Sequence, residues 1–138
     1  MQRIIEADKA GTLQCTGNWT AGQAFGHLAA WIDYNYVGYP FTVPAPIRFV
    51  ARLMKRRLLT RPMRPGIRLP RTEGGTYAIE PLSTDEGARQ LHEALNRLDR
   101  REPPGHDSPA LGTLTADELI ELNLRHAELH LVFFEYDA

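Results

Sequence analysis

The sequence contains a single cysteine, no long apolar run and no acidic residue across a long central stretch. Cys15 has no second thiol with which to form an internal disulfide, which favours a reducing compartment. The first residues lack the sustained apolar core of a signal peptide, and no run approaches the roughly 18 to 20 apolar residues of a membrane span. We therefore expect a cytoplasmic protein with no membrane partner.

The chain has 138 residues, the usual length of one domain, and 43% of them are hydrophobic, which is enough to form a core. Residues 61–75 and 103–112 are rich in proline and glycine and fit loops between helices. We expect a single domain over residues 1–138. The formal net charge of −1 gives no indication of a partner.

The charges are unevenly distributed along the chain. No acidic residue lies between Asp33 and Glu73, and this stretch contains nine basic residues: Arg48, Arg52, Lys55, Arg56, Arg57, Arg61, Arg64, Arg68 and Arg71. One interpretation is a solvated helix face and loop, paired in part with the acidic last helix. The other is an anion site, for nucleic acid or for the carboxylates of a thiol cofactor. Because no nucleic-acid motif accompanies these residues, we do not expect a nucleic-acid partner.

Helix starts are the clearest local signals. Residues 20–23, 83–86 and 115–118 each match a capping box, in which two side chains satisfy free backbone N–H groups. A fourth helix is expected from Pro46 to just before Arg61, because Pro62 disfavours helical geometry in the residue that precedes it. The helix from Thr20 should end near Val37. Residues 2–9 are expected to form a short N-terminal helix.

The apolar residues recur with the period of a helix. The helix from Pro46 carries an apolar row of Ile47, Val50, Ala51, Met54 and Leu58. We expect the helix from Ser83 to bury Ala88, Leu91, Leu95 and Leu98. Residues 76–79 are the only strand-like fragment, and they are too few to support a sheet. The pattern predicts an all-α bundle.

Three histidines fall on apolar helix faces. His126 and His130 are four residues apart in the last helix, in one row with Leu119, and His27 lies in a row with Trp31 in an early helix. In one interpretation each is an ordinary core histidine with its own hydrogen bond. In the other, a divalent transition metal satisfies all three inward imidazoles at once and keeps open coordination positions.

The remaining candidates are weaker. Cys15 is expected in a loop without a nearby base, and His92 on a solvated helix flank. His106 is a loop residue and a remote candidate for a fourth ligand. Asn123 shares the face of His126, where it could orient a ligand or a metal-bound water, or could be a polar residue at the core edge. Glu128 should point away from the histidines, so that a general-base role is not expected.

Four segments of the chain together resemble a known family: Asn18-Trp-Thr-Ala-Gly-Gln23-Ala-Phe-Gly-His27-Leu-Ala, Gly38-Tyr-Pro, Ser108-Pro-Ala-Leu-Gly-Thr-Leu-Thr115 and Leu124-Arg-His126-Ala-Glu-Leu-His130-Leu-Val-Phe-Phe. They resemble the DinB-like superfamily, and within it the DUF1569 group, to whose linker residues 64–70 are also similar. The resemblance covers nearly the whole chain. It implies a four-helix bundle with one metal on His27, His126 and His130. The short segment before Trp19 would shorten the first helix.

The resemblance also suggests what such a site could do. Members of the superfamily include enzymes that use low-molecular-weight thiols, and members without known activity, the DUF1569 group among them. The first hypothesis is therefore a metal-dependent transferase or hydrolase acting on a small molecule or thiol. Zinc, nickel, iron and manganese all suit neutral imidazole ligands. The alternative is a non-enzymatic structural or interaction bundle, with core histidines or a structural metal. Under either hypothesis we expect Trp19, Trp31 and Tyr34 to be packing residues rather than a substrate box.

The last helix also predicts an assembly. Phe133 and Phe134 are adjacent and cannot both face one core, and Leu122, Leu129 and Val132 widen the apolar arc of this helix. A shortened first helix would leave such a face uncovered. We expect a homodimer that uses helix faces rather than the basic stretch.

Overall fold

The computed structural model describes residues 1–66, 68–69 and 72–137. Within these ranges the chain is mostly helical, and the predicted all-α bundle is confirmed. The elements follow in the order α1 (Gln2–Ala10), β1 (Gln14–Cys15), α2 (Ala21–Val37), α3 (Ala45–Leu53), α4 (Lys55–Thr60), the short 3₁₀ turn η1 (Glu73–Gly75), α5 (Thr84–Asp99), α6 (Ala116–Leu131) and β2 (Phe134–Glu135). Arg71 of the basic stretch, and Ile67 and Pro70 of the linker segment, lie outside the described residues.

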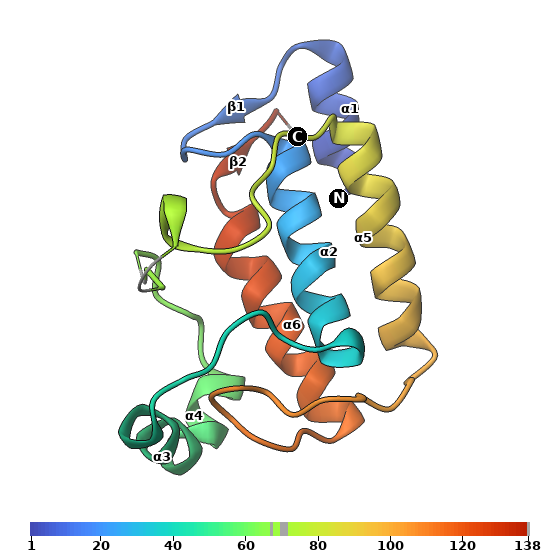
Figure 1. The fold of residues 1–138 in the computed structure, drawn as a ribbon. Helices are drawn as coiled ribbons and strands as arrows, with labels where there is room; N and C mark the ends of the chain where they lie inside the picture. Colours follow the sequence, from blue (N-terminus) through green and yellow to red (C-terminus); the bar gives the residue numbers. More distant parts are fainter. Residues whose placement is uncertain (67, 70–71, 138) are drawn as a thin grey trace.

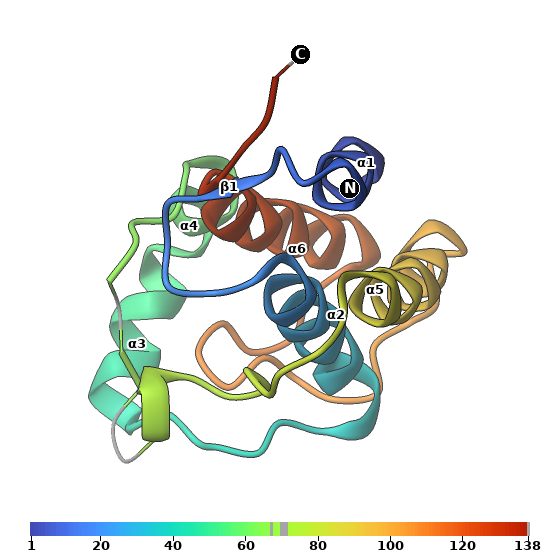
Figure 2. The ribbon, with the colours of Figure 1, turned by 90° about the horizontal axis from the view of Figure 1, so that it is seen from above.

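Three long helices form the body of the molecule. In the view from above, α2 lies at the centre with α6 and α5 beside it, and α1 lies near one end of α5 (Figures 1 and 2). The α1 helix has 9 residues, whereas α2 has 17 and α5 and α6 have 16 each. The expectation of a shortened first helix is therefore confirmed. Both views place α3 and α4 on the opposite side of α2 and α6 from α5.

The helix caps agree with the sequence in two of three cases. Thr20 and Gln23 form a complete capping box at the start of α2, as do Thr115 and Glu118 at α6. At α5 only half of the box forms, because Ser83 accepts the N–H of Glu86 while the Glu86 carboxylate binds Arg89. A charge-assisted bond to a guanidinium is stronger than one to a neutral backbone N–H, which explains this choice.

The helix expected from Pro46 differs from the prediction in two ways. It begins at Ala45 and is interrupted at Met54, so that α3 and α4 are separate helices. Its apolar row does not form a buried face, because Ile47, Val50, Met54 and Leu58 are exposed. Only Leu59 of these two helices is buried. Periodicity correctly found an apolar face but could not show which way that face points.

A smaller expectation also needs correction. Leu95 is exposed and the small Ala94 is buried in its place, because the contact row of α5 against the core runs through Leu91, Ala94 and Leu98.

Residues 76–79 form no strand, in agreement with the expectation that they are too few to support a sheet. The strands β1 and β2, which were not predicted, pair antiparallel, with Gln14 opposite Glu135 and Cys15 opposite Phe134. Two-residue strands are too short to produce an alternating pattern in the sequence.

The core lies where α2 meets α5 and α6. Phe25 of α2 and Leu119 of α6 are almost completely buried at its centre. Near their N-termini α2 and α5 approach so closely that a Cβ added at Gly87 would lie 2.5 Å from the carbonyl oxygen of Gly22. This backbone contact fixes the spacing of the two helices. No helix among the described residues combines the length and the apolar character needed to cross a membrane.

We predict that Gly87→Ala lowers the stability of the protein, although alanine normally stabilises a helix relative to glycine. The added methyl group would meet the backbone of α2, and such overpacking costs roughly 1 to 3 kcal/mol. The melting temperature, measured by circular dichroism, should therefore fall. Gly26→Ala is the matched control, because its Cβ would meet only the end of the flexible Leu82 side chain. A melting temperature of Gly87→Ala at or above that of the parent would show that α2 and α5 are not in backbone contact.

Candidate metal centre

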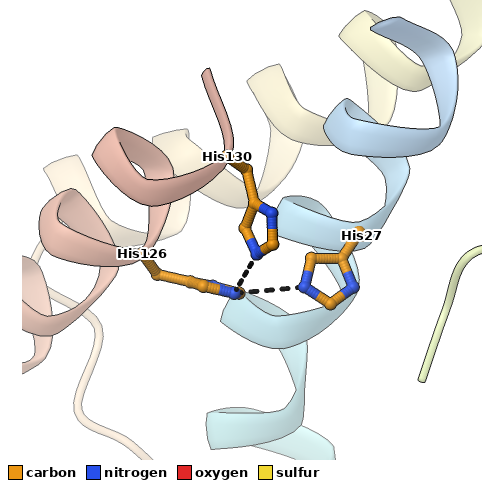
Figure 3. Close-up of side chains that lie close together, drawn as sticks. All are labelled: His27, His126 and His130. Carbon is orange, nitrogen blue, oxygen red and sulfur yellow. Dashed lines mark hydrogen bonds between the residues drawn. The ribbon is translucent and has the colours of Figure 1, made fainter. Parts of the chain in front are cut away.

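The structure brings the three histidines together between two helices. His27 comes from the middle of α2, and His126 and His130 come from successive turns of α6 (Figure 3). The Nε2 atom of His126 lies 3.1 Å from the Nε2 atom of His27 and 3.1 Å from that of His130. One ligand atom of each residue lies within 4.8 Å of the others. Nitrogens that share a tetrahedral zinc ion are about 3.3 Å apart, which is close to this spacing.

A backbone carbonyl fixes the protonation of His27. This side chain is 1% exposed, and its Nδ1 atom lies 2.8 Å from the carbonyl oxygen of Tyr77. Because a carbonyl oxygen can only accept, Nδ1 carries the proton and donates it. In the neutral ring Nε2 then presents a lone pair toward His126 and His130. A carbonyl bound to the far nitrogen is the usual arrangement behind a metal-ligating histidine.

Protons alone cannot satisfy the contacts among these three neutral rings. The Nε2 atom of His27 has no proton to donate, so a hydrogen bond to it requires the proton on Nε2 of His126. That N–H makes one well-aligned bond, which leaves the contact of His126 with His130 without a matching donor and acceptor. If Nε2 of His126 has no proton, two lone pairs face each other at His27. A cation at the meeting point of the three Nε2 atoms would satisfy all of them.

The surroundings keep the three rings neutral. Burial, followed by the proximity of His130, lowers the pKa of His27 to about 4. Burial also lowers the pKa of His130 to about 4. Burial, followed by the proximity of His27 and His130, holds the pKa of His126 well below its usual range. Neutral imidazole is the form that binds metals.

Gln23 and His27 hold the same loop segment against α2. The Gln23 amide donates to the carbonyl oxygen of Ile79 at 2.9 Å, one helical turn before the bond from His27 to Tyr77. The oxygen of the same side-chain amide accepts the backbone N–H of Thr20 in the capping box. Gln23 therefore both starts the helix and orders the loop that orients His27. The sequence did not indicate the role of Tyr77, because every residue carries a carbonyl.

Tryptophan rings pack directly on the histidines. The ring of Trp19 stacks on His130 with centroids 4.8 Å apart, and Trp31 lies 5.2 Å from the ring of His126. Both also contact His27. The two tryptophans are packing residues, as predicted, but the rings that they pack against are the candidate ligands. The sequence signal for this is the spacing of four that separates Trp19, Gln23 and His27.

The structure places the other histidines away from this group. His92 is exposed on α5, as predicted. His106 is exposed and lies against Gly38 at the end of α2, so that it does not join the three ligands.

Three further candidates have other partners. Asn123 is buried and donates to the carbonyl oxygen of Leu119 in its own helix at 2.8 Å. Glu128 is exposed and binds Arg125 at 2.8 Å, consistent with the expectation that it points away. Cys15 lies in β1 rather than in a loop. Burial and the negative charge of Asp8 raise the pKa of its thiol, which disfavours the nucleophilic thiolate.

The basic stretch contacts the last helix through one strong ion pair. Lys55 lies 2.8 Å from the carboxylate of Glu118 and also donates to the carbonyl oxygen of Thr113. Arg56, Arg57, Arg61 and Arg64 are exposed. The expected pairing with the acidic helix is therefore present in part.

The comparisons with known proteins identify a family without a known activity. A family model described as "Protein of unknown function (DUF1569)" matches residues 2–137. No curated protein and no solved structure matches the chain.

We predict that the metal-free protein loses stability as the pH falls from about 6.5 to about 4. In this window the unfolded chain binds protons on histidines that stay neutral when folded, so that stability decreases with falling pH. For the buried His27 alone a lowering of this size corresponds to roughly 3 kcal/mol. Urea unfolding in the presence of a chelator would measure it. His130→Gln should flatten the profile and His92→Gln should leave it unchanged; a profile unaffected by His130→Gln would contradict the assigned neutral state.

Proposed function

We propose that this chain, which belongs to the DUF1569 family of proteins of unknown function, binds one divalent transition metal ion through His27, His126 and His130. The observation that carries the proposal is the unmatched pair of Nε2 contacts around His126. With Nδ1 of His27 committed to Tyr77, no arrangement of protons on neutral rings satisfies both contacts by well-aligned bonds. A metal ion accepts all three lone pairs.

Several features of the site fit such an ion. The three rings are held by two helices, a backbone carbonyl and stacked tryptophans, so that little rearrangement is needed on binding. Their lowered pKa values keep them unprotonated near neutral pH. Neutral imidazoles accept zinc, nickel, iron or manganese. One histidine from an early helix and two from the last helix are also the ligands that the resemblance to the DinB-like proteins implies.

The arrangement leaves room for chemistry on the ion. In the described part of the chain, the group of potential metal donors consists of these three histidines, which leaves a further coordination position available. His126 and His130 remain partly accessible to solvent. A bound divalent ion lowers the pKa of a coordinated water or thiol and so supplies a nucleophile at neutral pH. We therefore propose transfer of a low-molecular-weight thiol, or hydrolysis, on a small-molecule substrate as the reaction class.

A structural metal is the alternative role for the same site. His27 and His126 are 99 residues apart in the chain, so that a shared ion would join α2 to α6. A tightly bound ion raises the melting temperature in either role. A large fall in melting temperature on addition of a chelator, together with no accessible cavity beside the histidines, would favour the structural role.

We predict that protein purified without an affinity tag contains one transition metal ion per chain, and that the double variant His126→Ala/His130→Ala contains none. Elemental analysis measures this directly. The expected loss follows from removal of two of three ligands. His92→Ala/His106→Ala removes the same number of imidazoles outside the site and should retain the ion.

Loss of the fold must be separated from loss of the ligands in this experiment. Circular dichroism reports whether the double variant is still helical, and a titration of chelator-treated parent protein with zinc gives the affinity without any substitution. Equal metal contents of the parent and the double variant, or no zinc uptake by the folded parent, would overturn the proposal.

We also infer that a second copy of the chain covers the open side of the bundle. Between α5 and α6, where a longer α1 would pack, lies a largely apolar groove of about 450 Å³ lined by Leu28, Leu91, Leu95, Ile120, Leu124 and Leu131 among others. Leu124 of α6 and Val132, directly after this helix, are exposed. Phe133 instead packs on Gly17 within the chain, and Phe134 is buried. A shared groove of this kind suits a symmetric dimer.

Light scattering at micromolar concentration should then give about twice the 15.6 kDa mass of one chain. Leu95→Asp/Leu124→Asp should convert the dimer to a monomer, because it would place charges in a desolvated interface. Substitutions of the same kind at the exposed Ile47 and Val50, on the opposite side of the bundle, should leave the mass unchanged. A parent mass of one chain would show that the groove is not a dimer interface.

A further inference from the structure

The α3 helix presents its apolar face to solvent rather than to the core. Leu53 is 73% exposed, Phe49 65%, Ile47 58% and Val50 53%, and no residue of α3 is buried. Phe49 and Leu53 are separated by one helical turn, and Val50 adjoins Leu53 from three residues before it. Single exposed apolar residues are ordinary, but a contiguous apolar helix face marks an interaction surface.

The side of the helix that packs against the protein carries Ala51, the one residue of α3 that is not exposed. Arg48 and Arg52, one turn apart, are themselves exposed and flank the apolar face. The guanidinium of Arg52 reaches the loop at Gly112, where an added Cβ would lie 3.2 Å from it. Just beyond, Lys55 binds Glu118 of α6. These contacts and the packing of Ala51 hold the helix against the protein, and its large apolar side chains remain exposed.

The charged residues of the segment that carries the apolar face are all basic. No acidic residue occurs from residue 34 to residue 72, whereas Arg56, Arg57, Arg61 and Arg64 follow the helix directly and are all exposed. Both ribbon views place α3 and α4 at the outer edge of the molecule, across α2 from α5 and its groove (Figures 1 and 2). A dimer that closes the groove would therefore leave this surface free.

We propose that α3 and α4 dock on an anionic lipid surface. Bulky apolar side chains on one helix face together with neighbouring basic residues are the two features that hold an amphipathic helix in the plane of a membrane interface. The apolar residues would enter the boundary of the acyl chains, and the arginines would bind phosphate and carboxylate groups of the lipids. Such docking is attachment to the surface of the membrane, and it requires no membrane-spanning segment.

The charge pattern favours lipid over the other occupants of such a face. In a symmetric contact of α3 with a second copy, the two sets of arginines would lie near each other without acidic partners from this segment, which opposes association. Nucleic acid would match the arginines, but four large exposed apolar side chains would have no role on a phosphate backbone. Anionic lipid matches both features at once.

Vesicle flotation with the intact protein tests the proposal. The probes are vesicles of phosphatidylcholine alone and vesicles of phosphatidylcholine mixed with phosphatidylserine. We expect binding to the mixed vesicles only, weakened by added salt because the attraction is screened. Phe49→Ser/Leu53→Ser and Arg56→Gln/Arg57→Gln should each lower the partition coefficient roughly tenfold or more.

Matched variants show whether the effect belongs to this surface. Val37→Ser removes an exposed apolar side chain at the end of α2, outside the groove, and Arg100→Gln/Arg101→Gln removes two exposed charges elsewhere. Both should bind vesicles as the parent does. Because Phe49 and Leu53 are exposed, their replacement should also leave the melting temperature unchanged, which separates docking from a folding defect.

Three results would overturn the proposal. The first is a parent protein that does not bind the mixed vesicles. The second is vesicle binding that Phe49→Ser/Leu53→Ser does not weaken. The third is a loss of dimer mass in that variant together with equal binding of the parent to both vesicle types, which would assign the face to a second copy. None of these outcomes depends on the metal site, whose failure would show only in the metal content.

Discussion

The hydrogen bond from His27 to the carbonyl oxygen of Tyr77 is the interaction on which the candidate site depends. It determines which nitrogen of His27 is protonated, and therefore that the opposite nitrogen offers a lone pair to the two histidines of α6. Without it, Nε2 of His27 could carry the proton and would then offer no lone pair to a metal ion. The carbonyl in turn stays in place because Gln23 holds Ile79, two residues further along the same segment. A loop without regular structure is thus a part of the site.

The packing of the helices sets the positions of the three histidines. The backbone contact of α2 with α5 near Gly22 and Gly87 anchors α2 at its N-terminal end, one to two turns before His27. On the other face of α2, the buried Leu119 fixes α6 so that His126 and His130 point to His27. The small residues of α2 and α5 allow these two helices to lie close together. The large residues between α2 and α6 hold this second pair of helices far enough apart for three imidazoles.

Local signals in the sequence predicted most of the helices. The caps at Thr20 and Thr115 and the stops at Gly38 and Pro62 depend on neighbouring residues only, and the structure has helix ends beside all four. The three histidines were predicted to lie on inward faces by spacing alone, and they do meet. What the sequence could not give depends on the rest of the chain: the outward direction of the apolar face of α3, the pairing of strands about 120 residues apart, and the choice of one carbonyl among many for His27.

The pairing of β1 with β2 has a consequence for how the molecule tolerates change at its C-terminal end. Cys15 lies opposite Phe134, and Thr16 donates to the carbonyl oxygen of Phe133, so that the chain leading into Trp19 is attached to the chain leaving His130. Trp19 stacks on His130 at this junction. The last few residues are therefore part of the frame around the imidazoles, and a deletion or fusion that strips β2 away would release Trp19 and His130 together, although neither residue had been altered.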